Sequence, residues 1–150
     1  PNIERSNGIV RGFGRVPLPS FAFGESGLSS STPLAAFLSG ANEVAPVVGD
    51  PDGSGVSNVW IIPSLRLVCY AFSVEDIDTI TMAHIHAGAV DANGPVVVDF
   101  NPVANGDSNC VRVTDRALLN AIASNPAGYY VNIHTVAFPR GAVRGQLQPQ

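Results

Sequence analysis

The sequence predicts an all-β fold: a β-sandwich of about seven or eight short strands with one small helix. From residue 34 onward, apolar runs of strand length recur, several of them alternating with polar positions. Clusters of Gly, Pro, Asn and Asp separate these runs, and only one segment has helical periodicity. At 150 residues the chain is long enough to bury a substantial core as a single domain.

The strands follow one another with short connections. They are expected at 34–40, 56–62, 65–74, 80–87, 95–100, 129–137 and 141–147. The loops between them are expected at 46–55, 63–64, 76–79, 91–94, 101–109 and 138–141. Residues 91–94 read Asp-Ala-Asn-Gly, a composition typical of a tight hairpin turn.

The helix is expected at 114–124. Thr114 is the candidate N-cap residue, and the apolar stripe consists of Ala117, Leu118, Ala121 and Ile122. Tyr129 and Tyr130 follow the helix directly, and we expect both rings to pack against it.

Charge and hydropathy exclude two classes of protein. The net charge is −4, and the eight basic residues are all arginines scattered along the chain, so nucleic-acid binding is not expected. No apolar run approaches the ~18 residues that a transmembrane helix needs.

Residues 1–33 differ from the rest of the chain. They are rich in Gly, Pro and Ser, yet they carry large apolar side chains at Ile9, Val10, Phe13, Val16, Leu18, Phe21 and Phe23. A free linker would not need these side chains. We therefore expect an extended arm that docks on its own domain or adds a strand to a neighbouring subunit, which would make the protein a homo-oligomer.

The chain contains two cysteines, Cys69 and Cys110. One disulfide in an oxidising compartment is the preferred interpretation; two buried thiols and a copper-ligating cysteine are the alternatives. The chain begins at Pro1 without a methionine, and removal of a secretory signal peptide is one explanation. Together these features predict a secreted, extracellular or periplasmic protein.

All three histidines lie in two strand-like phrases, Ala83-His84-Ile85-His86-Ala87-Gly88 and Tyr130-Val131-Asn132-Ile133-His134-Thr135. Alternate residues of a strand share a face, so His84 and His86 project to the same side about 7 Å apart. That spacing suits two imidazoles that bind one metal ion, and His134 can supply a third.

Five ordered phrases resemble the CHRD domain, which is named after chordin and also occurs in secreted bacterial proteins. The phrases are Leu38–Pro46 (Leu-Ser-Gly-Ala-Asn-Glu-Val-Ala-Pro), Ala83–Gly88, Asn93–Val97 (Asn-Gly-Pro-Val-Val), Tyr130–Thr135 and Arg144–Leu147 (Arg-Gly-Gln-Leu). The similarity covers residues 34–148. It implies an immunoglobulin-like or superoxide-dismutase-like Greek-key sandwich over residues 34–150, in an extracytoplasmic protein. In chordin these domains belong to a protein that captures growth factors.

Three imidazoles on strands form a ligand set that copper or zinc prefers. Glu43 or Met82 can provide a fourth ligand. The alternative is that the histidines hydrogen-bond to Asn132, Thr135 or loop carbonyls and only organise the sandwich. Arg144 is expected to form an internal ion pair with Glu43 or Asp99, or to face a ligand.

Two functional hypotheses follow. The first is a secreted, non-catalytic sandwich that binds copper, or zinc, through His84, His86 and His134, since neither a general base nor a nucleophile is identifiable. The second is an extracellular filament or matrix subunit that assembles through residues 1–33, with structural histidines. Growth-factor capture rests on the analogy with chordin alone. A dismutase would need more histidines than the chain has.

Overall fold

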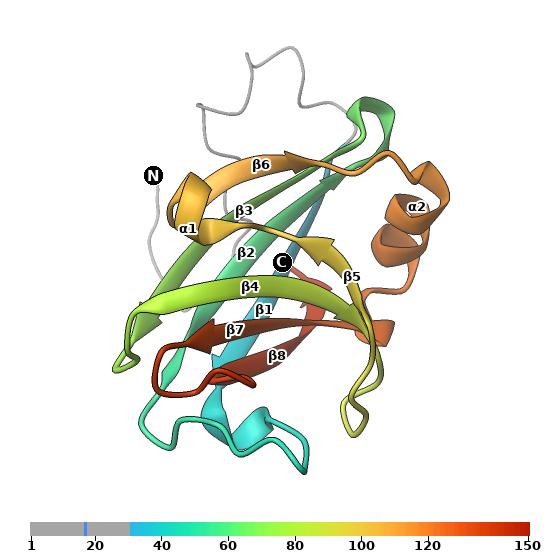
Figure 1. Ribbon diagram of the computed structural model, residues 1–150. Helices are drawn as coiled ribbons and strands as arrows, with labels where there is room; N and C mark the ends of the chain where they lie inside the picture. Colours follow the sequence, from blue (N-terminus) through green and yellow to red (C-terminus); the bar gives the residue numbers. More distant parts are fainter. Residues whose placement is uncertain (1–16, 18–30) are drawn as a thin grey trace.

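The computed structural model describes Pro17 and residues 31–150, and in this part of the chain eight strands form one antiparallel sheet. The strand order is β5-β4-β7-β8-β1-β2-β3-β6, and the sheet curls over so that its two halves face each other (Figure 1). The predicted all-β, sandwich-like fold is therefore confirmed. The strands are β1 (Thr32–Ser39), β2 (Ser54–Ile62), β3 (Leu67–Glu75), β4 (Ile80–Ala87), β5 (Val96–Asp99), β6 (Ser108–Arg112), β7 (Tyr129–Thr135) and β8 (Val143–Pro149).

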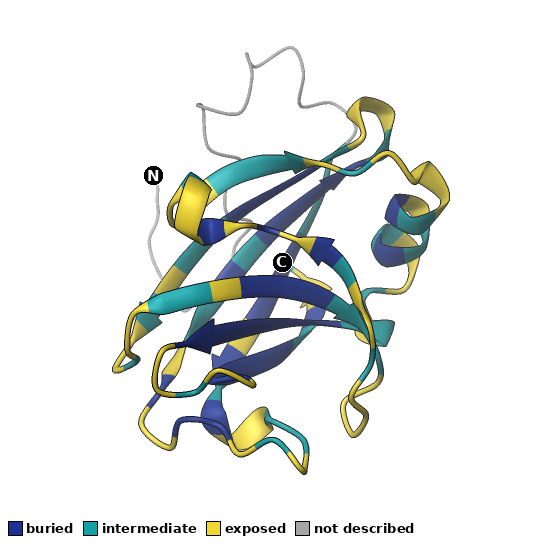
Figure 2. Cartoon of the chain, in the orientation of Figure 1, coloured by how far each residue is buried: buried dark blue, intermediate teal, exposed yellow. Residues whose placement is uncertain are grey.

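The main core fills the space between the two halves of the sheet. Buried side chains from β1, β2 and β3 pack with others from β4, β5, β7 and β8. Figure 2 shows the buried residues of these strands in dark blue. In β4 the core residues are Ala83 and Ile85, and in β7 they are Val131 and Ile133. Because side chains alternate along a strand, His84, His86 and His134 lie on the outer face of these two strands.

Two α-helices and three short 3-10 helices complete the described fold: α1 (Pro102–Asn105), α2 (Arg116–Ser124), η2 (Gly40–Asn42), η3 (Pro63–Leu65) and η4 (Pro126–Gly128). The predicted helix is present, but it begins at Arg116, because the carboxylate of Asp115 rather than Thr114 caps it by accepting from the Leu118 N–H at 3.1 Å. Its fully buried residues are Leu119 and Ile122. The predicted apolar stripe contained Ile122 but missed Leu119.

The prediction of a loop at 101–109 was wrong in part. This segment contains the one-turn helix α1 and the start of β6, which pairs with β3 at an edge of the sheet. β6 has five residues and few apolar side chains, so its composition resembles that of a loop. The helix α1 connects β5 to β6, the two edge strands of the sheet (Figure 1).

The predicted disulfide between Cys69 and Cys110 is confirmed. The two cysteines lie directly opposite each other in the β3–β6 register, so the bond fastens β6 to β3, its neighbour in the described sheet. Cys69 also belongs to a second apolar cluster, with Trp60 and Ile62, that is separate from the main core.

The predicted N-terminal arm, residues 1–33, lies mostly outside the described residues. Its last two residues, Thr32 and Pro33, already belong to β1. None of the helices described is long and apolar enough to cross a membrane.

Candidate metal centre

The three histidines meet on the outer face of the β4–β7 strand pair. In the antiparallel register of this pair, Met82 lies opposite His134, His84 opposite Asn132, and His86 opposite Tyr130. His84 and His134 are therefore diagonal neighbours across the two strands, a relation that side chains of this length can bridge. The structure brings together the three residues that the sequence singled out.

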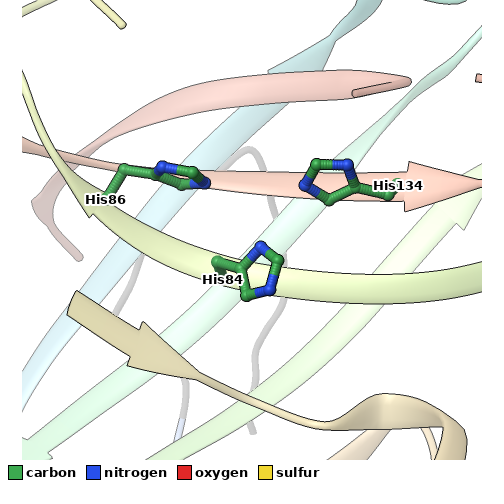
Figure 3. A group of neighbouring side chains, drawn as sticks. All are labelled: His84, His86 and His134. Atoms are coloured by element: carbon green, nitrogen blue, oxygen red, sulfur yellow. The ribbon is translucent and has the colours of Figure 1, made fainter. Parts of the chain in front are cut away.

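The three imidazole rings lie close together, and His84 meets each of the other two edge to face (Figure 3). The ring centroids of His84 and His134 lie 5.1 Å apart, and those of His84 and His86 lie 5.5 Å apart. One ring nitrogen from each histidine lies within 4.8 Å of the other two. Metal–nitrogen bonds of about 2.0–2.1 Å place tetrahedral ligands about 3.3 Å apart, so small ring rotations would close the site on an ion.

Hydrogen bonds to backbone carbonyls fix two of the rings. The Nδ1 of His86 lies 2.8 Å from the carbonyl oxygen of Gly94, and the Nδ1 of His134 lies 2.9 Å from that of Pro139. A carbonyl oxygen only accepts, so each Nδ1 carries the proton and each Nε2 keeps its lone pair. This is the arrangement that orients metal-binding histidines in proteins.

Each histidine has one buried ring nitrogen without a hydrogen-bond partner among the described residues: His84 Nδ1, His86 Nε2 and His134 Nε2. A buried polar atom that forms no hydrogen bond is costly, by about 1–3 kcal/mol. Three such atoms that gather in one place, each with a free lone pair, match the donor set of a metal ion. The residues present therefore fit a copper or zinc ion.

The surroundings of His84 and His86 favour the neutral form of these two rings. Burial is the main cause that lowers the pKa of His84, and the positive charge that His134 would carry lowers it further. Burial also lowers the pKa of His86. Neutral imidazole is the form that binds a metal ion.

Asp99 lies beside the outer nitrogen of His84. Its Oδ1 is 4.0 Å from His84 Nε2, and the two residues are opposite each other in the β4–β5 register. The Asp99 side chain is 65% exposed, so this carboxylate reaches the site from the solvent side. The negative charge of Asp99 favours a proton on His84 Nε2 and leaves Nδ1 free.

The two candidate fourth ligands lie in different surroundings. Met82 is on the same face of β4 as His84 and is 42% exposed. The carboxylate of Glu43 accepts a hydrogen bond from Asn132 Nδ2 at 2.5 Å. Among the described residues, the group of His, Cys, Asp and Glu donors within 4.8 Å of one another consists of the three histidines alone, without Glu43.

Arg144 is fully buried on the same outer face. Its hydrogen bonds go to the carbonyl oxygens of Ala89 and Ala92, both at 2.8 Å, and to the side chains of Asn93 and Gln146, both at 3.3 Å. The charge of Arg144 acts on Glu43, where it opposes the effect of burial on the pKa of that carboxyl. A direct ion pair between the two residues stays a prediction.

The sequence phrases that resembled one family therefore converge on one face of the molecule. Residues of the loop at 40–50, of β4, of the loop at 88–95, of β7 and of β8 contact one another there. A family model for the CHRD domain matches residues 34–147. The chain belongs to the CHRD domain family. A search of the curated proteins found no significant match, and a search of the solved structures found none either.

The site of this CHRD domain also contains residues that sequence reasoning missed. Tyr130 was expected to pack against the helix, but its ring stacks on His86, with centroids 4.7 Å apart and an interplanar angle of 3°. Gly94 and Pro139 act through backbone carbonyls, which carry no signal in a sequence. Tyr130, however, precedes Asn132 and His134 by steps of two residues, and this strand period could have placed it on the histidine face.

Proposed function

We propose that this CHRD domain binds a single transition-metal ion, copper in preference to zinc, through His84 Nδ1, His86 Nε2 and His134 Nε2. The observation that carries the proposal is the set of three buried ring nitrogens without hydrogen-bond partners, one on each histidine. A polar network alone would satisfy these atoms, whereas a metal ion uses all three at once.

The donor chemistry favours copper. Three neutral imidazoles suit both copper and zinc, but the chain's single methionine, Met82, lies opposite His134 on the same face. A thioether is a soft ligand that selects Cu(I). We therefore propose Met82, rather than the hydrogen-bonded Glu43, as the fourth ligand. We propose that the role is binding rather than catalysis.

The proposed compartment is extracytoplasmic. A disulfide between Cys69 and Cys110 persists in an oxidising environment and is rare in the cytosol. This supports a secreted or periplasmic protein that encounters copper outside the cytoplasm.

The test is a competition titration of the purified protein with copper, together with elemental analysis. We expect one ion per chain. In His86→Ala the affinity should fall by more than about 100-fold, because loss of one of the three imidazole ligands exceeds the 10–100-fold cost of losing its outer partner. Gln148→Ala, an exposed position on the same side of β8, is the matched control and should bind like the wild type. Equal copper affinity in His86→Ala and the wild type would contradict the proposal.

A second candidate function is assembly through residues 1–30. The large apolar side chains of this segment, such as Ile9, Phe13, Phe21 and Phe23, are more than a free linker needs. We propose that the apolar arm of one copy docks on a second copy.

Deletion of residues 1–30 tests this assembly. We expect the oligomer to dissociate into a species of lower mass in light scattering. A deletion variant that keeps the mass of the parental oligomer would contradict assembly through the arm.

A further inference from the structure

The ring of Tyr130 lies between a metal-ligand candidate and a buried cation. Its stacking partner on one side is His86 of β4, and the Cζ of Arg144, from β8, lies 3.4 Å from the centroid of the Tyr130 ring. In the sheet, β7 lies between β4 and β8, so the two groups approach Tyr130 from its two neighbouring strands. Arg144, Tyr130 and His86 thus form a column of stacked planar groups, named here the stacked column.

The cation at the base of the stacked column is rigidly held. Arg144 is 1% exposed, and its Nη2 donates to the carbonyl oxygens of Ala89 and Ala92. Among the described residues, its hydrogen-bond acceptors are neutral oxygens, and the carboxylates of Glu43 and Asp91 act on it through their charge alone. A buried charge acts over several ångströms because the protein interior screens it weakly.

Gly94 connects the column to the metal centre. Its N–H donates to the Tyr130 hydroxyl at 3.1 Å, and its carbonyl oxygen accepts from His86 Nδ1 at 2.8 Å. One loop residue therefore fixes the tyrosine and the histidine together. The His86 ring is held on its face by Tyr130 and at its Nδ1 edge by Gly94, which leaves Nε2 directed at the other histidines.

We propose that Tyr130 and Arg144 are positioning residues of the metal centre: they orient His86 Nε2 toward the ion and set a fixed positive charge behind it that favours Cu(I) over Cu(II). The inference rests on the proposed copper function. A fixed cation repels a dication twice as strongly as a monocation at the same distance, so its removal should favour Cu(II). The bound copper would supply the Cu(I)/Cu(II) couple, and the charge of Arg144 would shift this couple toward Cu(I).

Two substitutions at Tyr130 test the orientation. Tyr130→Phe keeps the stacked ring, whereas Tyr130→Leu removes it. We expect Tyr130→Leu to lose about 10–100-fold in Cu(I) affinity, as other outer partners of metal ligands do, and Tyr130→Phe to retain most of the affinity. In the metal-free protein, imidazole nitrogen NMR should show one fixed His86 tautomer in the wild type and Tyr130→Phe, and an averaged one in Tyr130→Leu.

Two substitutions at Arg144 test the charge. Arg144→Lys keeps the positive charge without the planar stack, and Arg144→Gln removes the charge. We expect a lower copper reduction potential in Arg144→Gln than in Arg144→Lys. An equal or higher potential in Arg144→Gln would overturn the electrostatic role. If circular dichroism finds Arg144→Gln unfolded, the Cu(I)/Cu(II) affinity ratio of Arg144→Lys relative to the wild type decides instead, because a preserved charge predicts a ratio near that of the wild type.

The outcomes separate the two proposals. Wild-type copper affinity in Tyr130→Leu, beside tight binding by the wild type, would overturn the positioning role and leave the metal function intact. A wild type that binds no copper, with a His86 tautomer that still depends on Tyr130, would overturn the proposed function and with it the bias toward Cu(I). In that case the ring orientation by Tyr130 would stand as a property of the fold.

Discussion

Gly94 and His86 are joined by a hydrogen bond of 2.8 Å between the carbonyl oxygen of one and the imidazole Nδ1 of the other. This contact depends on the absence of a side chain at position 94. A Cβ built there would lie 1.6 Å from the carbonyl oxygen of Ala87, the residue that follows His86 in β4. The loop at 88–95 can therefore approach the strand closely enough to fix the histidine only because residue 94 is a glycine.

We expect Gly94→Ala to weaken both the fold and the metal centre. The methyl group clashes with backbone rather than with a flexible side chain, so the loop must move away from β4 and break the contact with His86. The free energy of unfolding should fall by about 2–3 kcal/mol, as for other changes that break buried packing. Urea unfolding and copper titration measure the two effects.

Ala92→Ser is the control for this substitution. Ala92 lies in the same loop and is exposed, so an added hydroxyl meets solvent. Its unfolding curve and copper affinity should match those of the wild type. If Gly94→Ala retained wild-type copper affinity despite a lower stability, the carbonyl contact would have no part in metal binding.

The sequence predicted the side chains of this site that lie on strands, but not the backbone contacts that come from loops. The two-residue period of a strand and the resemblance to the family were sufficient to predict that His84, His86 and His134 lie close together. The carbonyls of Gly94 and Pro139 could not be predicted, because every residue has a carbonyl and only the path of the loop decides where it points. The strand β6 was not predicted because its sequence has no apolar pattern. It is a strand because it pairs with β3 at the edge of the sheet.

Glu43 should make the stability of the protein depend on pH. Burial raises the pKa of this carboxyl from 4.5 to about 7, although Arg144 and the hydrogen bond from Asn132 oppose the shift. Between pH 4.5 and 7 the folded state therefore binds more protons than the unfolded state, so this group destabilises the fold as the pH rises through 7. Glu43→Gln removes the ionisation and keeps an oxygen that can accept from Asn132.

We expect the difference in the free energy of unfolding between Glu43→Gln and the wild type to shift in favour of the variant by about 1–2 kcal/mol from pH 5 to pH 8.5. This value allows for solvent screening of a partly exposed group. Urea unfolding at the two pH values measures it. A difference that does not change with pH would show that the carboxyl ionises freely in the folded protein.

The histidines should produce the opposite pH dependence in the metal-free protein. The pKa values of His84 and His86 are lowered from 6.5 in the folded state, so below pH 6.5 the unfolded state binds more protons. Stability from these groups is present above pH 6.5 and is lost as the pH falls through their folded values. The experiment is best done in Glu43→Gln, where the opposing carboxyl is absent. Stability that stays constant below pH 6.5 in this background would contradict burial of neutral rings.

The disulfide should stabilise the fold without affecting the metal centre. Cys69 and Cys110 are 41 positions apart, and closing a loop of this length stabilises by roughly 4 kcal/mol in the chain-entropy model. We expect the double substitution Cys69→Ser/Cys110→Ser to lower the free energy of unfolding by up to that amount. Copper affinity measured below the unfolding transition should not change, because β3 and β6 lie at the other end of the strand order from β4 and β7.

Met82 should decide which metal the centre prefers. A soft thioether contributes to the binding of Cu(I) but little to that of Zn(II), whereas the three imidazoles serve both ions. Met82→Leu keeps the size and apolar character of an exposed side chain, so we expect the fold to be unaffected. Cu(I) affinity should fall by about tenfold, in the range seen for weaker contributions to metal sites, while Zn(II) affinity stays unchanged. Parallel competition titrations with the two ions measure the ratio. An equal change for both ions would assign Met82 to the packing of the site and leave the three histidines as the complete protein ligand set.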